Sequence, residues 1–232
     1  MSDLLQESAR DSSTNQGRVR QRPCAPLWRP RLVEKVAGRV EKLIDNYRYR
    51  NWFDGKDFTS DWTSGNFTTW RRVLSGWRDE PLRILEIGSW EGRSALFFLN
   101  FFGRATITCV DHFVQGNEER FDRNLGPFAA RLEKIKSPSG PALDNLVATG
   151  RHFDLAYIDA DHGHDAVVGD SRAVWQLVGP GGVVIWDDYR WGRKWLPPEK
   201  RSDGAVDAFL RDHAGQYRLL AKSYQIIIER TR

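Results

Sequence analysis

Cysteine, methionine and long apolar runs are scarce in this chain of 232 residues. Cys24 lies in a loose basic segment and Cys109 in a segment that reads as a buried strand, so we expect no structural disulfide and a reducing, cytoplasmic location. No apolar run approaches the roughly 20 residues that span a bilayer, so we expect no membrane association. The first residues are polar and mixed in charge, without the apolar core of a secretory signal.

The overall composition is that of a globular protein, with 40% hydrophobic and 28% charged residues and a formal net charge of +4. Basic residues gather near the start, and we expect residues 1–30 to form a flexible basic arm. The basic residues near the start are Arg18, Arg20, Arg22, Arg29, Arg31, Lys35 and Arg39. Such an arm can follow nucleic-acid phosphates, but a solvated flank is the simpler interpretation of so short a cluster.

Hydrophobic periodicity predicts a helical and aromatic extension over residues 31–80. Its first helix covers 31–49 and its second covers 64–76. The apolar stripe of the first helix consists of Leu32, Val36, Val40, Leu43 and Ile44. We expect this extension to contribute to a substrate site, through aromatic residues such as Trp62, Phe67 and Trp70, or else to pack against the main domain.

Strands and helices alternate after Pro81. Strands are expected at 83–87, 105–110, 132–136, 154–158, 182–186, 217–222 and 224–229. Helices are expected at 92–102, 116–130, 139–149, 164–177 and 203–213. Strands separated by helices indicate a parallel sheet, whereas the last two strands should form an antiparallel hairpin. The sequence therefore predicts a Rossmann-like, doubly wound α/β domain of seven strands over residues 81–232.

A glycine turn joins the first expected strand to the next helix, in the segment from Ile84 to Ser94. Gly88 allows a tight turn and a close ligand, and the helix that follows favours a negatively charged group at its start. Trp90 stands where a dinucleotide fingerprint would have glycine. Asp111 ends the next strand, where an acid can accept hydrogen bonds from ribose hydroxyls. Separately, these features also suit an ordinary strand-to-helix connection and a turn aspartate.

Carboxylates and a histidine follow two further strands, in Asp159-Ala-Asp-His162 and in the pair Asp187-Asp188. Open α/β sheets place ligands at the carboxyl ends of their strands. Clustered carboxylates suit a hard divalent cation, and a nearby histidine is a candidate general base. The alternative is a set of solvated residues at strand ends.

Together these motifs resemble those of class I S-adenosylmethionine-dependent methyltransferases. They are most similar to the metal-dependent O-methyltransferases, which include catechol, caffeoyl-CoA and macrolide-sugar enzymes. The motifs are Glu86-x-Gly88-x-x-x-Gly92-x-Ser94, Asp111, Asp159-Ala-Asp-His162 and Gly179-Pro-Gly-Gly-Val-Val-Ile-Trp-Asp-Asp188. The resemblance covers about residues 60–230 and implies a seven-stranded sheet with a terminal hairpin.

The resemblance also implies roles for individual residues. Those expected to hold S-adenosylmethionine are Glu86, Gly88, Trp90 and Ser94 at its methionine and ribose end, Asp111 at the ribose hydroxyls, and Ser137 near the adenine. Those expected to hold Mg²⁺, or else Mn²⁺ or Ca²⁺, are Asp159, Asp187 and Asp188. Catechol-type enzymes have asparagine at the position of Asp188. His162 falls where sugar-methylating relatives carry a histidine, which makes it the expected general base.

We therefore expect a metal-dependent O-methyltransferase acting on a hydroxyl of a small molecule, such as a sugar, a glycosylated natural product or an aryl diol. Arg190, Arg193 and Lys194 are candidates to meet an acidic substituent of that molecule. One alternative is a metal-independent methyltransferase acting on RNA or another macromolecule, although an acidic rim repels phosphates unless a metal ion fills it. A nicotinamide-dependent oxidoreductase is disfavoured by Trp90 and by the absence of a Tyr-x-x-x-Lys pair. A nucleic-acid-binding module and a homo-oligomer stay open.

Overall fold

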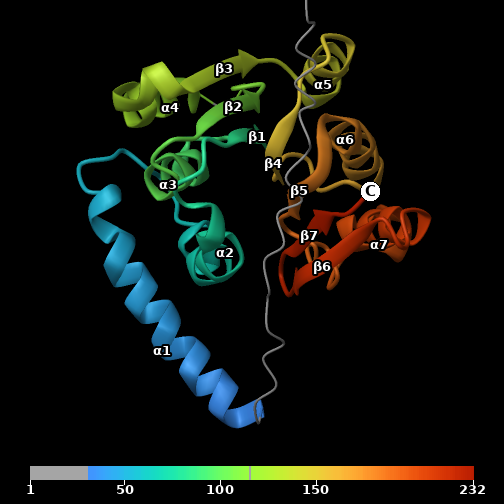
Figure 1. Cartoon of the computed structure of the whole chain (residues 1–232), viewed down its shortest axis with the longest axis horizontal. Coiled ribbons are helices and arrows are strands. Elements are labelled where there is room, and N and C mark those ends of the chain that lie inside the picture. Colours follow the sequence, from blue (N-terminus) through green and yellow to red (C-terminus); the bar gives the residue numbers. More distant parts are fainter. Residues whose placement is uncertain (1–30, 115) are drawn as a thin grey trace, which may run out of the picture.

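The computed structural model describes residues 31–114 and 116–232, so the expected basic arm over 1–30 lies outside the described residues. A seven-stranded sheet runs through the protein in the order β3-β2-β1-β4-β5-β7-β6 (Figure 1). The strands are β1 (Arg83–Ile87), β2 (Thr106–Asp111), β3 (Leu132–Lys136), β4 (Phe153–Ile158), β5 (Val178–Trp186), β6 (Tyr217–Lys222) and β7 (Ile226–Arg230). Strands β1 to β5 are parallel, and β7 is antiparallel to both β5 and β6. The predicted fold class is confirmed.

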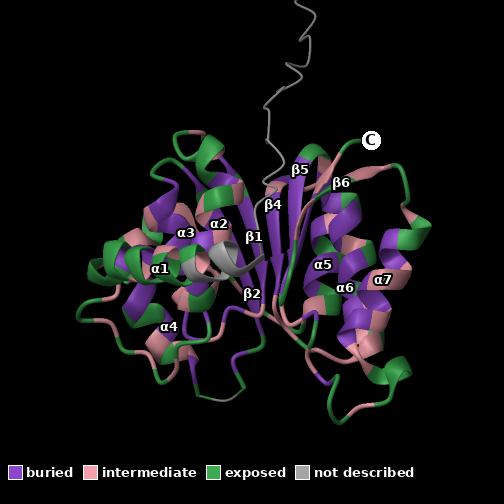
Figure 2. Cartoon of the chain, turned by 90° about the horizontal axis from the view of Figure 1, so that it is seen from below, coloured by how far each residue is buried: buried purple, intermediate pink, exposed green. Residues whose placement is uncertain are grey.

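Helices cover both faces of the sheet, as the alternation of elements requires (Figure 2). One face carries α1 (Arg31–Tyr49), α2 (Phe67–Leu74), α3 (Arg93–Phe101) and α4 (Glu118–Leu125). The other carries α5 (Ser139–Ala148), α6 (His164–Leu177) and α7 (Ser202–Asp212). None of these described helices combines the length and the apolarity that crossing a bilayer requires.

The strand order creates a switch point beside β1, which is where open α/β sheets bind ligands. From β1 the chain winds through β2 and β3 to one edge, and it then returns to β4 on the other side of β1. Hydrogen bonds continue past the strand ends, since the backbone N–H of Asp159 donates to Ile87 O at 2.8 Å and that of Asp187 donates to Ile158 O at 2.9 Å. The segments after β1, β4 and β5 therefore meet at one rim.

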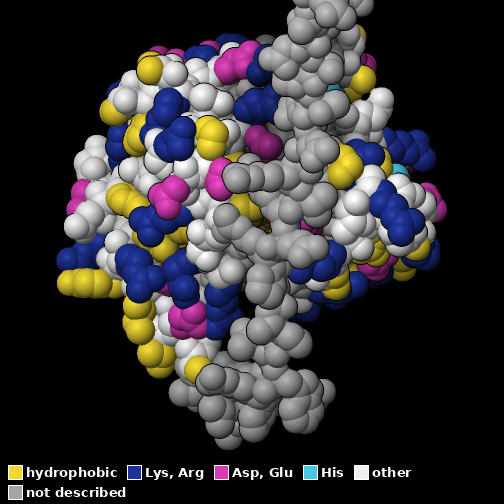
Figure 3. Space-filling model, in the orientation of Figure 1, with side chains coloured by type: hydrophobic (Ala, Val, Ile, Leu, Met, Phe, Trp, Pro, Cys, Tyr) yellow, Lys and Arg dark blue, Asp and Glu magenta, His cyan; other side chains and the backbone are white. Residues whose placement is uncertain are grey.

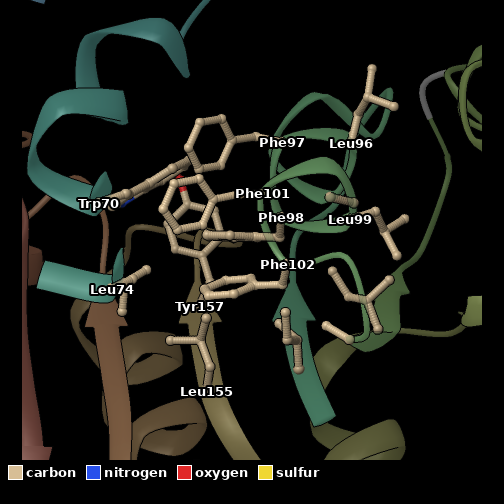
Figure 4. Close-up of a cluster of buried hydrophobic side chains, with 14 of the residues drawn as sticks. Trp70, Leu74, Leu96, Phe97, Phe98, Leu99, Phe101, Phe102, Leu155 and Tyr157 are labelled. Atoms are coloured by element: carbon tan, nitrogen blue, oxygen red, sulfur yellow. The ribbon is translucent and has the colours of Figure 1, made fainter. Parts of the chain in front are cut away.

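Aromatic rings attach the extension to the sheet (Figure 4). The rings of Phe67 on α2 and Phe97 on α3 stack with their centroids 4.4 Å apart. Trp70 on α2 meets the Tyr157 ring on β4 edge-on at 5.4 Å. Because Phe67 and Trp70 are fully buried, these two aromatic residues pack the extension and do not face a ligand.

Helix α1 contacts the protein with its polar face and not with the apolar stripe that the sequence suggests. Glu41 and Asp45 form ion pairs with Arg71 of α2, at 2.9 Å between Asp45 Oδ1 and Arg71 Nε. The stripe residues whose side chains are described, Val40, Leu43 and Ile44, are exposed, and Figure 3 shows hydrophobic side chains along the outer edge of this helix. Periodicity predicted the helix, but ion pairing decides which face packs.

Several boundaries also differ from the prediction. The helix expected at 116–130 ends at Leu125 and continues as a 3₁₀ turn, Gly126–Arg131, with Pro127 near its start. Proline lacks the N–H that an α-helix uses, which explains the change. The helix expected at 64–76 is α2 between two such turns, Ser64–Asn66 and Ser75–Trp77. Strand β5 begins at Val178, before its glycines, because Val178 pairs with Phe153 across a register shift.

Candidate active site

One large cavity of about 1090 Å³ opens at the carboxyl ends of β1, β2, β4 and β5. Its lining includes most of the residues that the sequence analysis proposed for cofactor, metal and catalysis. These are Gly88, Trp90, Asp111, Ser137, Asp159, His162, Asp187 and Asp188. Ligand sites of drug-sized molecules occupy roughly 300–1,000 Å³, so this cavity has room for a cofactor together with a second molecule.

Gly88 is required by the way the first turn packs. Its φ is +85°, and a Cβ added there would lie 2.1 Å from the backbone oxygen of Asp159. The turn after β1 is therefore in direct contact with the start of the acidic segment after β4, across the switch point. Only glycine fits this approach without moving the backbone.

Replacing Gly88 tests this contact. We expect Gly88→Ala to lower the melting temperature and to abolish binding of S-adenosylhomocysteine (SAH), because a positive φ costs about 1–3 kcal/mol in a non-glycine residue and the overlap adds a comparable cost. Calorimetry measures both effects. Gly169→Ala is the matched control, since Gly169 lies in α6 with no atom near its added Cβ and should keep both properties. A Gly88→Ala protein that melts and binds like the parent would contradict the packing argument.

Asp111 holds the backbone of two neighbouring turns. Its Oδ2 accepts a hydrogen bond from the Trp90 N–H at 2.8 Å, and its Oδ1 accepts one from the Phe113 N–H at 2.7 Å. Both of these donors have positive φ, +48° at Trp90 and +52° at Phe113. The carboxylate thus stabilises two strained turns while lying in the cavity lining, where it is placed to meet hydroxyl groups.

Glu86 lies beneath the glycine turn and outside the cavity lining. It is fully buried, and the Sγ of Cys109 donates to its Oε2 at 3.3 Å. Burial raises the pKa of Glu86 to about 7. Ser94 lies near this carboxyl group and lines a small adjoining pocket of about 40 Å³. In this structure Glu86 supports the turn that faces the cavity.

Acidic groups converge in the same cavity, in the segments that follow β4 and β5. Asp159, His162 and Asp188 each offer a ligand atom, and these atoms all lie within 4.8 Å of one another. His162 Nε2 is 3.1 Å from Asp188 Oδ2. Burial, together with the neighbouring carboxylates, raises the pKa of Asp159. Carboxylates gathered in this way at half-buried positions suit a cation.

Asp187, the third predicted metal ligand, sits beside this trio with both oxygens engaged. Its Oδ1 accepts the N–H of Asp188 at 2.7 Å. Its Oδ2 accepts from the Tyr157 hydroxyl, from Gln225 Nε2 at 2.9 Å and from Asn66 Nδ2 at 3.3 Å. Burial raises the pKa of Asp187 as well. Asp188 follows with φ +50°, a backbone conformation that aspartate tolerates better than most residues.

Sequence reasoning missed the residues that surround Asp187. Tyr157 could have been found, because it lies two residues before Asp159 and alternate residues of a strand share a face. Gln225 precedes β7 and Asn66 precedes α2, and neither has a local signal, since only the tertiary fold brings them to β5.

The outer part of the cavity has aromatic walls and one basic residue in its lining. The walls include Trp62, Trp191 and Tyr224, and the Trp191 ring lies 5.1 Å from the His162 ring. Lys42 of α1 is the cation in this lining. Arg193, which the sequence analysis offered as a partner for an acidic substituent, is instead paired with Asp203 at 2.7 Å.

Comparisons with known proteins indicate the class of this domain. Residues 85–189 match a family model described as a methyltransferase domain. An uncharacterized protein of Acanthamoeba polyphaga mimivirus is 26% identical over 165 residues, which cover 66% of this chain and 70% of that protein. The family match spans β1 to the turn after β5, and so includes both halves of the cavity floor.

Solved structures share the fold at low sequence identity. The MycE methyltransferase of the mycinamycin biosynthetic pathway, in complex with Mg and SAH, aligns with a TM-score of 0.62 and 21% identity over 81% of this chain. That alignment covers 54% of MycE, so the chain spans about half of its length. An SAH-bound methyltransferase of Podospora anserina aligns with a TM-score of 0.57 and 18% identity, over 90% of this chain and 100% of that one.

A candidate O-methyltransferase of Klebsiella pneumoniae aligns with a TM-score of 0.62 and 16% identity, over 84% of this chain and 99% of that one. Alignments at such identities establish the fold, while the family match establishes the kind of domain. Together they confirm the predicted resemblance: residues 85–189 match a methyltransferase domain, and the chain has the seven-stranded fold of the methyltransferases to which it aligns.

Proposed function

We propose that this protein is an S-adenosylmethionine-dependent O-methyltransferase that uses a divalent cation and methylates a hydroxyl of a small molecule. The observation that carries the proposal is the division of one cavity. Gly88 and Asp111 line it at the ends of β1 and β2, and Asp159, His162 and Asp188 line it after β4 and β5. MycE, with the same fold, was solved with Mg, SAH and mycinamycin VI, which supports this combination of ligands.

The residues around the glycine turn fit the proposed cofactor. S-adenosylmethionine, when bound, supplies a methyl group on a sulfonium that is already activated for transfer. Gly88 leaves the space that a side chain would fill, and Asp111 offers oxygens to ribose hydroxyls. Ser137 lies in the same lining, and the buried indole Nε1 of Trp90 has no partner within the described residues. The chain thereby binds and orients the donor.

The acidic side fits a hard divalent cation. Oxygen ligands suit Mg²⁺, Mn²⁺ and Ca²⁺, and Asp159 and Asp188 would hold the ion, with Asp187 beside them. A bound cation favours the ionised form of a hydroxyl oxygen that it contacts. The single Tyr157 hydroxyl that lies between Asp159 and Asp187 can donate a hydrogen bond to only one of them, which leaves the other carboxylate free to hold a cation.

His162 is the proposed general base. Its ring lines the cavity beside the acidic cluster and against Trp191, where it can accept the proton of the acceptor hydroxyl. Transfer then forms an oxygen–methyl bond and breaks the sulfur–methyl bond, and the proton stays on the imidazole. Positioning the acceptor oxygen in line with the methyl group is the other contribution of the protein.

The aromatic walls and the acidic floor support an acceptor with a ring and two neighbouring hydroxyls, such as a sugar or an aryl diol. Rings can stack on Trp62 or Trp191, and Lys42 could meet an acidic substituent. A cytoplasmic location and a homo-oligomeric state stay predictions.

The first experiment is a calorimetric titration of the protein with SAH, followed by methylation assays on catechols and sugar diols. We expect micromolar SAH binding, and turnover that stops with a chelator and returns with Mg²⁺, because the acidic cluster needs a cation to hold the acceptor. Absence of SAH binding would overturn the cofactor assignment. Turnover that persists in the chelator would overturn the metal assignment alone.

A further inference from the structure

We infer that Tyr157, Gln225, Trp70 and Asn66 form a carboxylate brace that positions the acidic residues for a divalent cation. The inference rests on the proposed metal dependence and assigns roles to residues beyond the predicted ligands. The four residues come from β4, from the turn before β7, and from α2 with the turn before it. The extension and the terminal hairpin would thus shape the metal site together.

Gln225 is oriented by the chemistry of its neighbours. The Trp70 Nε1–H donates to Gln225 Oε1 at 2.9 Å, and an indole nitrogen can only donate. The oxygen of the Gln225 amide must therefore face Trp70, which turns its Nε2 toward Asp187 Oδ2 at 2.9 Å. Both side chains are buried, so water does not compete for these bonds. Trp70 thereby ensures that Asp187 meets a donor.

Tyr157 sets the spacing of two carboxylates. Its hydroxyl is hydrogen-bonded to Asp187 Oδ2 and lies 2.9 Å from Asp159 Oδ2. The ring is held edge-on by Trp70 at 5.4 Å and by Phe98 at 5.7 Å, so the hydroxyl has little freedom to move. The hydroxyl has one proton, and by donating it to Asp187 it holds that carboxylate next to Asp159 against their mutual repulsion.

The brace reaches Asp188 through the backbone. With Tyr157, Gln225 and Asn66 donating to its Oδ2, Asp187 keeps its Oδ1 on the Asp188 N–H at 2.7 Å. That bond accompanies the positive φ of Asp188, whose side chain turns toward His162. Loss of the brace should therefore release Asp187 and the turn that presents Asp188.

The test is the affinity of Mn²⁺, measured by the electron paramagnetic resonance signal of the free ion, for the full chain and its variants. We expect Tyr157→Phe and Gln225→Met to weaken Mn²⁺ binding by about 10–100-fold, the range seen when residues that orient metal ligands are changed. Trp70→Phe keeps an aromatic ring and should weaken binding less. SAH affinity, measured without metal, should stay at the parent value in all three, which a general loss of structure would not allow.

Tyr189→Phe is the matched control, because it removes a hydroxyl that donates to Asp207 at 2.8 Å and to no predicted metal ligand. If one of the three brace variants loses SAH binding, Asn66→Ala is measured in its place. Asn66 is only half-buried and donates to the same Asp187 oxygen. Unchanged Mn²⁺ affinity in the folded brace variants would overturn the brace alone. A parent chain that binds no Mn²⁺ would overturn the proposed metal site, and the brace with it.

Discussion

Asp159→Asn is expected to abolish binding of the divalent cation and to reduce methyl transfer by on the order of 10³-fold, the scale of losing a strong electrostatic contributor in an active site. Asparagine keeps the shape of the side chain but removes its charge from the trio with His162 and Asp188. Mn²⁺ titration and rates measured at saturating Mg²⁺ check the two effects. SAH binding should stay, because the glycine turn is not altered.

The same substitution should stabilise the metal-free protein. Burial raises the pKa of Asp159 above its ordinary value, so ionising this group costs more in the folded state than in the unfolded state. This cost is absent below the ordinary pKa near 3.8 and grows as the pH rises toward the folded-state value. Asp159→Asn should therefore raise the melting temperature, measured with a chelator, by more at pH 8 than at pH 4.

Asp165→Asn is the control for both effects, since Asp165 is fully exposed at the start of α6. It should leave Mn²⁺ affinity, rate and melting temperature as they are. If Asp159→Asn still bound Mn²⁺ like the parent, the ion would have to lie elsewhere, and the proposed arrangement of the cavity would be wrong.

The sequence predicted the sheet well because each strand is a short apolar run between turns and helices. The final hairpin followed from the absence of a helix between β6 and β7. Less predictable were features set by contacts between distant elements. The packing face of α1 depends on Arg71 and Arg72 of α2, and the start of β5 depends on pairing with Phe153.

In the candidate site, too, some features could be predicted from the local sequence and others depend on contacts between distant elements. Asp159, His162 and Asp188 directly follow strand ends, so their convergence could be predicted from parallel strands, and the structure brings them together. The hydrogen bonds from Gln225 and Asn66 to Asp187 bridge 38 and 121 positions of the chain. No local pattern encodes such contacts, because they exist only once the hairpin and the extension have docked.

Backbone strain is concentrated at the rim of this cavity. Within the described residues, the non-glycine residues with positive φ are Trp90, Phe113 and Asp188, and each follows a strand that ends at the cavity. Residues held in such conformations cost about 1–3 kcal/mol and persist where the surroundings fix them. Here hydrogen bonds from the Trp90 and Phe113 N–H groups to Asp111 and from the Asp188 N–H to Asp187 do so. These hydrogen bonds fix the backbone of the cavity rim.

His162→Gln is expected to lower kcat by about 10²–10⁴-fold, the usual contribution of a general base. The structure offers two roles for this side chain, since it lies in the trio with Asp159 and Asp188 and also faces the space for the acceptor. The Mn²⁺ titration distinguishes these two roles. A base that is not a ligand can be lost with unchanged Mn²⁺ affinity, whereas loss of a ligand weakens the binding of the ion.

We expect unchanged Mn²⁺ and SAH affinities together with the low kcat, and added imidazole should partly restore turnover in His162→Ala, because a small free base can enter the space left by the side chain. His164→Gln is the matched control: His164 is paired with Asp165 at 3.0 Å, and it should keep the parent rate. A large fall in Mn²⁺ affinity in His162→Gln, without rescue by imidazole, would make His162 a metal ligand and leave proton removal to another group.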